Sequence, residues 1–296
     1  MTKVPNSRVN LDKAINRFAG NPRKADALRN LLANVIVAQM IPEGVVKGGS
    51  SLKFRYGSAE TRATMDLDTA WKNDLDTFLV GLKEKLSAGW GGFAGTLVVG
   101  RQASPKGIPF DYVMQPCDVK LTYLKKPWYT VRLEIGHNEI GDADECEAVN
   151  APSDVIELCT ALGLPEPMPI SVMRLEFQIA QKLHGVSAPH SRRAHDLIDL
   201  QLILMRNEIN MPMTADICRR LFAYRQVHAW PPRITKGEGW ETVYDGQRMD
   251  LPVLESVDAA IEWCNELIAR LDSAVSACAP SPTQGKVSCE RGLKDN

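Results

Sequence analysis

The sequence offers a candidate phosphate-binding turn close to its N-terminal end. The apolar pair Val45-Val46 is typical of a short strand, and Gly48-Gly49-Ser50 follow almost at once. Glycines after a strand let backbone N–H groups approach phosphate oxygens closely, and a serine hydroxyl adds a further donor. This order of residues predicts a strand-to-turn transition at which Gly48, Gly49 and Ser50 bind the phosphates of a nucleotide.

A pair of aspartates stands in an alternating segment shortly after this turn. Residues 65–71 have the alternation of a strand, on which residues two apart share one face. Asp66 and Asp68 are therefore expected to project together, while Leu67 points into the core. Two neighbouring carboxylates suit Mg²⁺, which prefers oxygen ligands and keeps further positions for substrate phosphates. Arg62, just before this strand, is a candidate either for a triphosphate contact or for a brace of the turn.

These two segments together resemble a known superfamily. The strand that leads into the glycine pair and the strand with two acids are similar to the signature of the DNA polymerase β-like nucleotidyltransferases. The resemblance implies a mixed sheet that carries the active site. It also implies a third carboxylate, which in two-metal phosphoryl transfer ligates a metal ion or orients the attacking hydroxyl.

Glu134 is the first candidate for this third carboxylate. Apolar residues alternate through 131–135, which places Arg132 and Glu134 on the other face of the predicted strand. Asp111 is the rival candidate. In the alternative interpretation, Glu134 is a cross-strand partner for the neighbours of Arg132 and binds no metal.

A second cluster of charged residues lies on two segments with helical periodicity. Lys182 offers a compact positive charge that can neutralise triphosphate oxygens while pyrophosphate departs. The alternative for Lys182 is a solvated helix lysine. Asp196 is a candidate to hold this lysine in place. Asp199 lies three residues further on the same helical face and is interpreted as structural.

The second cluster narrows the resemblance to one family. An Ala-x-Lys-Leu helix, followed by the pair Arg192-Arg193, Asp196 and the Leu-x-Asp-Leu run 197–200, resembles the AbiEii/AbiGii nucleotidyltransferase toxins. This family includes the mycobacterial tRNA-modifying toxins. Residues 131–135 with Glu139 also resemble its acidic strand, so that the likeness extends from Val45 to about residue 204. The resemblance implies a nucleoside triphosphate as substrate, a tRNA 3′ end as acceptor, a block of translation and a cognate antitoxin as partner.

The periodicity predicts an α+β, or mixed α/β, first half. Leucines and other apolar residues recur at helical spacing in 22–40 and 74–86, where Asp74 or Asn73 is a plausible N-cap. Runs rich in β-branched residues at 96–99, 119–123 and 129–135 predict strands. We therefore expect a polymerase β-like domain with a mixed sheet and helices packed on it.

Helical patterns dominate the second half of the chain. They cover 153–162, 172–185, 194–207, 214–227 and 255–277, and the proline-rich stretch 164–169 is the expected linker. We therefore predict a nucleotidyltransferase domain over 1–163, a helical domain over 170–278 and a disordered tail over 279–296, which is rich in Pro, Ser, Gly and Lys. The active site is expected in a cleft between the two domains.

Composition narrows the function classes. Of the 296 residues, 44% are hydrophobic and 24% are charged, which is typical of a folded globular protein. No segment has the length and hydropathy of a membrane span or a signal peptide, so a cytoplasmic protein without membrane contact is expected. The net charge of −1 gives no general argument for nucleic acid, but residues 1–60 hold ten Lys and Arg against four Asp and Glu. This basic segment is the independent support for an RNA partner.

The remaining candidate ligands favour structural roles. Seven cysteines are scattered without a Cys-x-x-Cys pair, which indicates reduced thiols and no zinc site. His184, His190 and His195 match no zinc spacing and are not interpreted as metal ligands. Trp71 and Trp90 are expected in the core. Tyr56 is expected in the loop between the two motifs, where its ring could stack on a base.

The sequence therefore predicts a cytoplasmic nucleotidyltransferase that depends on Mg²⁺, with two metal ions possible. Its predicted catalytic residues are Asp66, Asp68, Glu134, Lys182 and Asp196. The nucleotide is expected at Gly48, Gly49, Ser50, Arg62 and Lys182, and the metal ions at Asp66, Asp68 and Glu134. One alternative keeps this site but modifies a hydroxyl of a protein or small molecule. Another makes the chain a non-catalytic nucleotide-binding module.

Overall fold

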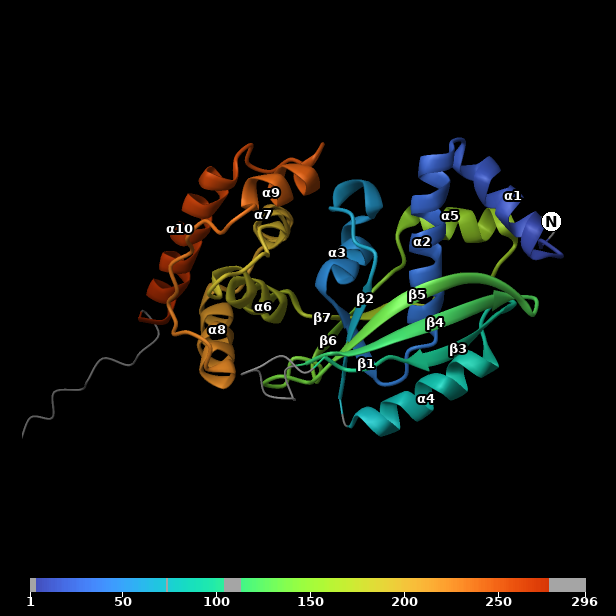
Figure 1. Cartoon of the computed structure of the whole chain (residues 1–296), viewed down its shortest axis with the longest axis horizontal. Helices are drawn as coiled ribbons and strands as arrows, with labels where there is room; N and C mark the ends of the chain where they lie inside the picture. The colour runs from blue at the N-terminus through green and yellow to red at the C-terminus, as the bar shows by residue number, and fades with distance from the viewer. Residues whose placement is uncertain (1–3, 73, 104–112, 277–296) are drawn as a thin grey trace, which may run out of the picture.

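A computed structural model describes residues 4–72, 74–103 and 113–276. Asp111, the alternative N-cap Asn73 and the predicted tail 279–296 lie outside these residues. The described chain is a mixed α/β structure in which helices α6 to α10 gather at one end, while the sheet and helices α1, α2, α4 and α5 occupy the other (Figure 1). The predicted fold class is thereby confirmed.

A seven-stranded mixed sheet organises the first half of the chain, in the order β3-β4-β5-β2-β1-β7-β6. The pairs β2–β5 and β1–β7 are parallel, and the other neighbours are antiparallel. The central strands are therefore β5, β2 and β1, whose ends carry the predicted motifs. The strand bounds are β1 Gly44–Lys47, β2 Leu67–Trp71, β3 Phe93–Val99, β4 Gln115–Tyr123, β5 Lys126–Gly136, β6 Cys146–Val149 and β7 Ile170–Met173.

Side chains of the appropriate type cap several of the helices. Ser7, Asn21 and Asp74 each accept a hydrogen bond from the backbone N–H three residues further on, as N-cap residues do. The helix bounds are α1 Arg8–Ala19, α2 Pro22–Gln39, α3 Gly48–Tyr56, α4 Leu75–Ala88, α5 Ser153–Leu162, α6 Leu175–Ser187, α7 His195–Arg206, α8 Met211–Arg225, α9 Trp240–Arg248 and α10 Val257–Ser276, with a 3₁₀ turn at Ser58–Glu60.

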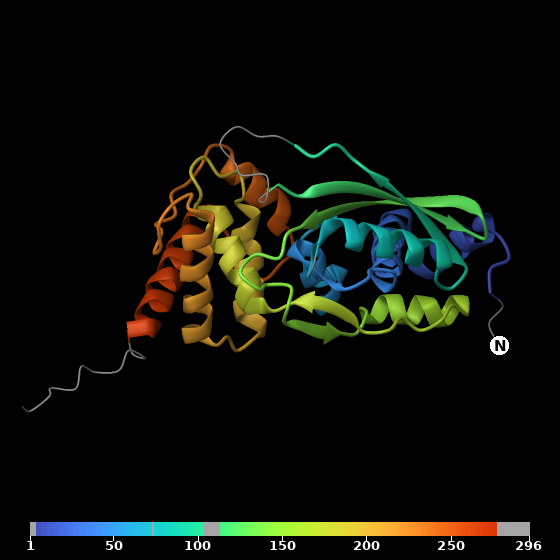
Figure 2. The same cartoon turned by 90° about the horizontal axis from the view of Figure 1, so that it is seen from below.

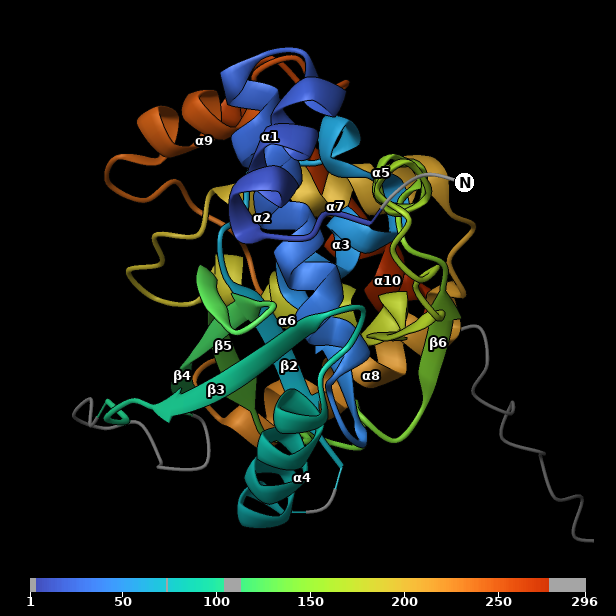
Figure 3. The same cartoon turned by 90° about the vertical axis from the view of Figure 1, so that its right-hand side faces the viewer.

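Two hydrophobic clusters fill the interior. The first joins α1, α2, α4 and α5 to the sheet, where alternate residues of β4 and β5 are buried. Figure 3 shows these helices seen from the sheet end of the molecule. The second joins helices α6 to α10 and also includes Val45 and Ala70 of the sheet. Because Val46 belongs to the first cluster and Val45 to the second, the helical half covers part of the opposite face. Figure 2 shows this helical half beyond one end of the sheet.

The structure differs from the predicted elements in three ways. Helices α1 and α9 and the short strands β6 and β7 were not predicted. Residues 48–56 form a helix directly after β1 and not a turn, so Tyr56 is the last residue of α3 and does not lie in a loop. Strand β7 lies beyond the predicted linker and pairs with β1 and β6, so the sheet extends into the stretch assigned to the helical domain. The division into two domains stays a prediction.

Within the described residues, no helix is both long and apolar enough to cross a membrane.

Candidate active site

Three charged side chains stand in one row across the central strands. Lys47 at the end of β1 pairs in register with Asp68 of β2, and Asp68 pairs with Glu134 of β5. Residues paired in this way point to the same face of a sheet. Leu133 and Ile135 are fully buried on the other face, as the alternation predicted. The row therefore lies on the face that the helical half partly covers.

Asp68 lies against the first residue of α3. Gly48 has φ +63°, and a Cβ added to it would lie 2.1 Å from Asp68 Oδ2. A side chain at this position would therefore both strain the backbone and displace the carboxylate. The N-cap of α3 is Lys47, which makes no side-chain capping bond. The N-terminal N–H groups of α3 therefore meet the end of β2 without a side-chain cap.

Helix α3 also fixes the segment that carries Asp66. The Ser50 hydroxyl donates to the Asp66 carbonyl oxygen at 2.5 Å, and Lys53 Nζ donates to the Thr64 carbonyl oxygen at 2.9 Å. Ser50 is 1% exposed. Its hydroxyl thus braces the acid segment, and a direct phosphate contact of Ser50 stays a prediction. Asp66 lies just before β2, and its Oδ1 is buried without a hydrogen-bond partner.

The surroundings of the carboxylates in this row raise their pKa values. Burial raises the pKa of Asp68 to about 6, Lys47 opposes this rise, and Glu134 adds to it. The pKa of Glu134 is also raised, first by burial and then by the charge of Asp66. Mutual repulsion of this kind is typical of acids that share one site. The strand register thus places Asp68 beside Glu134, and the charge of Asp66 acts on Glu134; a shared metal site of the three acids stays a prediction.

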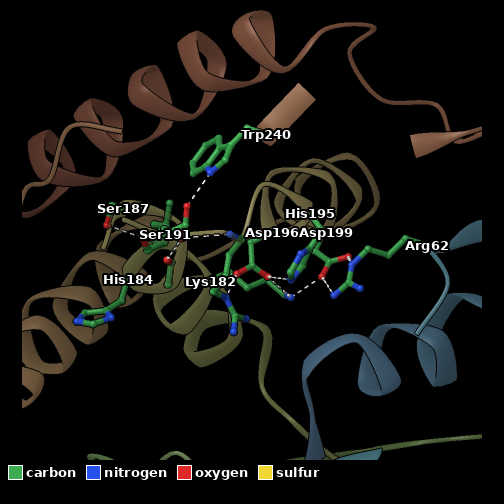
Figure 4. A network of polar contacts seen from close by, with 12 residues as sticks. Arg62, Lys182, His184, Ser187, Ser191, His195, Asp196, Asp199 and Trp240 are labelled. Atoms are coloured by element: carbon green, nitrogen blue, oxygen red, sulfur yellow. Dashed lines mark hydrogen bonds and ion pairs between the residues drawn. The ribbon is translucent and has the colours of Figure 1, made fainter. Parts of the chain in front are cut away.

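The second predicted cluster forms a buried ionic network in the helical half (Figure 4). Lys182 Nζ lies 2.6 Å from Asp199 Oδ2 and 3.2 Å from Asp196 Oδ1. The whole residue Lys182 is 3% exposed, so the alternative of a solvated helix lysine is wrong. Burial acts to raise the pKa of both aspartates, but the surrounding cations outweigh it and lower the pKa of each.

Two arginines extend this network toward the sheet. Arg62 donates to Asp199 through Nε and Nη2, both at 2.9 Å, and so joins the segment before β2 to α7. It is therefore a brace between the two halves, and Asp199 is shared between Arg62 and Lys182. Arg193 Nε lies 2.5 Å from Asp196 Oδ2, yet the Arg193 side chain is 53% exposed. Its positive charge also lowers the pKa of Asp68, as does that of Lys182.

The loop after β5 holds a further buried acid, on which the charge of Lys47 acts. Asp142 is 1% exposed and accepts hydrogen bonds from the Glu139 backbone N–H at 2.9 Å and from Gln181 Nε2 at 2.6 Å. Burial raises the pKa of Asp142 to about 7, and Lys47 is the largest influence against this rise. Glu139 itself forms an ion pair with Arg225 of α8. It therefore holds the loop to the helical half and does not join the carboxylate row.

The aromatic and imidazole candidates occupy packing positions. Trp71 is 5% exposed in the first core cluster, and Trp90 is partly buried against it. The guanidinium of Arg206 lies 4.9 Å from the centre of the Tyr56 ring, whose hydroxyl accepts a hydrogen bond from Asn207. These contacts occupy one ring face and the hydroxyl of the residue that was expected to stack on a base.

The three predicted histidines do not converge. His184 packs against His228 and Phe222, His190 is exposed in the connection before α7, and His195 Nε2 lies 3.9 Å from Asp196 Oδ1. Within the described ranges, no three His, Cys, Asp or Glu side chains are arranged as a ready-made metal site. All five cysteines in these ranges are free thiols.

The basic N-terminal segment is not one continuous surface. Lys47 and Lys53 are 5% and 6% exposed, and the Arg55 side chain is paired with Glu147. Arg29 of α2 is engaged by Asp12 and Asp26. The charge count of residues 1–60 therefore gives no independent support for an RNA-binding surface.

Comparison with known protein families shows to which family this chain belongs. A family model described as "Nucleotidyl transferase AbiEii toxin, Type IV TA system" matches residues 26–263. The chain belongs to this family. AbiEii membership confirms the resemblance inferred from the motifs, and it makes the chain a nucleotidyltransferase toxin of the toxin–antitoxin type. A nucleoside triphosphate substrate, a divalent metal ion and an antitoxin partner are the general properties of this family.

Several solved structures are similar to the AbiEii chain described here. JHP933 from Helicobacter pylori is 14% identical with a TM-score of 0.46, covering 86% of this chain and 95% of that one. A putative nucleotidyltransferase from H. pylori is 16% identical with a TM-score of 0.45, covering 86% and 98%. MenT4, a nucleotidyltransferase toxin from Mycobacterium tuberculosis, is 17% identical with a TM-score of 0.49, covering 90% and 98%. No curated protein matches the sequence.

Sequence reasoning missed two cations of this AbiEii site. Lys47 adjoins the glycine pair, but its place beside Asp68 and Glu134 depends on strand pairing, which the sequence does not reveal. Arg193 stands in the helical motif, and its only signal was its proximity to Asp196. A Cβ added to Gly185 would lie 2.8 Å from Arg193 Nε, so the glycine gives this arginine room to cross α6.

Proposed function

We propose that this AbiEii chain transfers a nucleotide from a Mg²⁺-bound nucleoside triphosphate to a hydroxyl of RNA, with a tRNA 3′ end as acceptor. The attacking oxygen forms a bond to the α-phosphorus, the bond from that phosphorus to the bridging oxygen breaks, and pyrophosphate leaves. The hydroxyl proton passes to solvent water as the new ester forms. Addition to the acceptor end of tRNA would block translation, and a cognate antitoxin would restrain the reaction.

The proposed roles follow from position and charge. Gly48, Gly49 and Ser50 open α3, whose N-terminal N–H groups face the place where phosphates would bind. Arg193, whose side chain is exposed and whose charge acts on Asp68, is the cation that we expect to reach the triphosphate from the helical half. Lys182, which shares Asp196 with Arg193, adds its positive charge to the same region.

The remaining charged residues of the helical network hold this charge in place. Asp196 fixes Lys182 and Arg193, and Arg62 fixes the acid segment through Asp199. Glu134 orients the attacking hydroxyl or ligates a metal ion. Each of these roles is a proposal to be tested by substitution.

The acids suit a hard divalent cation. Asp66 has a buried Oδ1 without a hydrogen-bond partner, and Asp68 and Glu134 repel each other in the same row. Carboxylate oxygens of this kind are the ligands that Mg²⁺ prefers. Asp66, Asp68 and Glu134 would hold the ion. When bound, it would neutralise charge on the triphosphate and on the departing pyrophosphate.

One observation carries the proposal: the register of β1, β2 and β5 sets Asp68 and Glu134 side by side, at the N-terminus of the helix that begins with the glycine pair. A non-catalytic binding module would gain nothing from this crowding, because neighbouring carboxylates repel each other and the negatively charged phosphates. A metal-dependent transferase needs both features.

The test is a transfer assay with total tRNA, Mg²⁺ and each α-labelled nucleoside triphosphate in turn. Wild type is compared with Asp66→Ala and with Asp118→Ala, which removes an exposed acid from the neighbouring strand β4. We expect label on tRNA with wild type and Asp118→Ala, and none with Asp66→Ala. Equal labelling by Asp66→Ala would refute the site. Label on protein would move the acceptor to a protein hydroxyl, and nucleotide binding without pyrophosphate release would favour the binding module.

A further inference from the structure

We propose that Lys47 is a counter-ion of the acids Asp68 and Glu134 in the free protein. Its positive charge repels a metal ion at these acids, so that the affinity for metal stays low until a triphosphate binds. The inference rests on the proposed metal site and concerns a residue for which no role follows from the motif. It makes productive metal binding depend on the nucleotide.

The position of Lys47 is fixed by the sheet. Its register partner is Asp68, whose own partner is Glu134, so the lysine is the first member of the row. A Cβ added to Gly136 would lie 2.4 Å from Lys47 Nζ. Gly136 stands two residues after Glu134 on the same face of β5. The ammonium group therefore reaches across β2 toward β5, into room that only a glycine leaves.

The surroundings of Lys47 are acidic and largely closed to solvent. Asp68 comes from β2, Glu134 from β5 and Asp142 from the loop after β5, and the charge of Lys47 acts on all three. Lys47 is only 5% exposed. A buried ammonium is costly unless anions compensate it, so the negative charge of these acids offsets part of the cost of burying Lys47.

Asp142 is held in a way that keeps this arrangement rigid. Gln181 of α6 donates to Asp142 Oδ2, and Arg220 of α8 donates to the Ile140 carbonyl oxygen at 2.7 Å. The helical half thus clamps the loop from two helices. The charge of Lys47 therefore still acts on Asp142, which the helices hold in place, when Asp68 binds another cation.

A divalent cation at Asp66 and Asp68 must share this small, poorly solvated region with the ammonium of Lys47. Like charges in such a region repel much more strongly than in water. The four negative charges of a nucleoside triphosphate would offset this repulsion. Metal ion and nucleotide should consequently bind with positive coupling, and the free protein should bind metal weakly.

The experiment measures Mn²⁺ affinity of the full chain in the absence of nucleotide, from the electron paramagnetic resonance signal of free Mn²⁺. Removing the ammonium in Lys47→Met should tighten Mn²⁺ binding by about tenfold or more, because the repulsion disappears. Asp142→Asn should weaken binding by several-fold, because the charge of Lys47 is then less compensated. Lys120→Met, which removes an exposed lysine from β4, should leave the affinity within about twofold of wild type.

The opposite signs separate an electrostatic role from damage to the fold. If Lys47→Met and Asp142→Asn both weaken Mn²⁺ binding, or if Lys47→Met leaves it unchanged, Lys47 is only structural and the inference is wrong. Should Lys47→Met fail to fold, Lys47→Gln replaces it with the same expected direction. Asp68→Asn identifies the site: unchanged Mn²⁺ affinity in that variant would overturn the proposed metal site and the inference together, whereas weakened affinity leaves only the Lys47 result to decide.

Discussion

The molecule handles buried charge in two contrasting ways. In the sheet, Asp68 and Glu134 stand side by side, the charge of Asp66 acts on Glu134, and Asp66 Oδ1 has no hydrogen-bond partner. In the helical network, Asp196 and Asp199 are almost wholly buried, yet each binds two cationic side chains at close range. The pKa of Asp68 is raised by burial, whereas that of Asp196 is lowered against the effect of burial.

The contrast indicates different roles for the acids of the sheet and the acids of the helical network. Acids left without close partners are costly in the free protein and gain most when a cation binds, as expected of a site for metal and substrate. Acids saturated by cations stabilise the geometry of those cations. The helical network thus holds Lys182 and Arg193 in place, while the sheet acids remain available for chemistry.

The sharpest test of this contrast is Asp68→Asn. We expect nucleotidyl transfer to fall by about 10³-fold or more, because a neutral amide is a poor metal ligand. We expect the free energy of unfolding at pH 7.5 to stay level or rise. The pKa of Asp68 is raised in the folded protein, so its ionised form opposes folding above pH 6. Transfer rates and urea unfolding measure the two effects, and a loss of stability above ~2 kcal/mol would contradict the contrast.

Asp199→Asn should behave in the reverse way. It leaves Lys182 and Arg62 with one partner charge fewer in a buried place, which typically costs ~3–5 kcal/mol of unfolding free energy. The matched control is Asp245→Asn, which removes the partner of a surface arginine and should cost less than ~0.5 kcal/mol. Urea unfolding of both variants measures the difference. Equal, small effects would mean that the network does not bear on stability.

Gly185→Ala should have a smaller effect, which distinguishes a displaced Arg193 side chain from a less stable protein. The added Cβ would lie 2.8 Å from Arg193 Nε and 3.3 Å from Asp196 Oδ2, so Arg193 must move. We expect kcat/KM for the triphosphate to fall by about tenfold, ~1.4 kcal/mol, with little change in the unfolding free energy. Gly246→Ala is the control, because an added Cβ there meets nothing within 4 Å. Wild-type kinetics in Gly185→Ala would remove Arg193 from the proposed site.

Local pattern predicted much of this architecture. The alternation through 131–135 located β5 and the face of Glu134, and helix 153–162 was predicted with the bounds of α5. Strand β7 was missed because its four residues follow three prolines and gain their structure by pairing with β1. Local propensity cannot indicate such a strand, since the pairing is non-local.

The site was predictable in its acids and less so in its cations. The spacing of Asp66 and Asp68 is local, so the sequence indicated it. The ion pair of Arg62 with Asp199 joins residues 137 positions apart, and the row of Lys47 with Glu134 depends on register across three strands. The motif therefore could not indicate that Asp199 binds both Arg62 and Lys182, although a structural role of Asp199 was predicted.

The smallest expected effect concerns His184, a buried histidine of the helical half that stays neutral. Burial, and then the charge of Arg225, lowers the pKa of His184 to about 3. Arg225 Nη1 lies 3.2 Å from His184 Nδ1, so protonation of that nitrogen would replace a hydrogen bond with repulsion. A histidine whose pKa is depressed in the folded state costs stability as pH falls below its unfolded value of about 6.5. Wild type should therefore lose unfolding free energy between pH 7 and pH 5, and His184→Gln should lose ~1 kcal/mol less over the same interval. Urea unfolding at both pH values measures the difference. His190→Gln, at an exposed position, should retain the wild-type slope. Parallel curves for all three proteins would show that His184 is protonated freely, and that the helical half accepts a buried charge without an anion beside it.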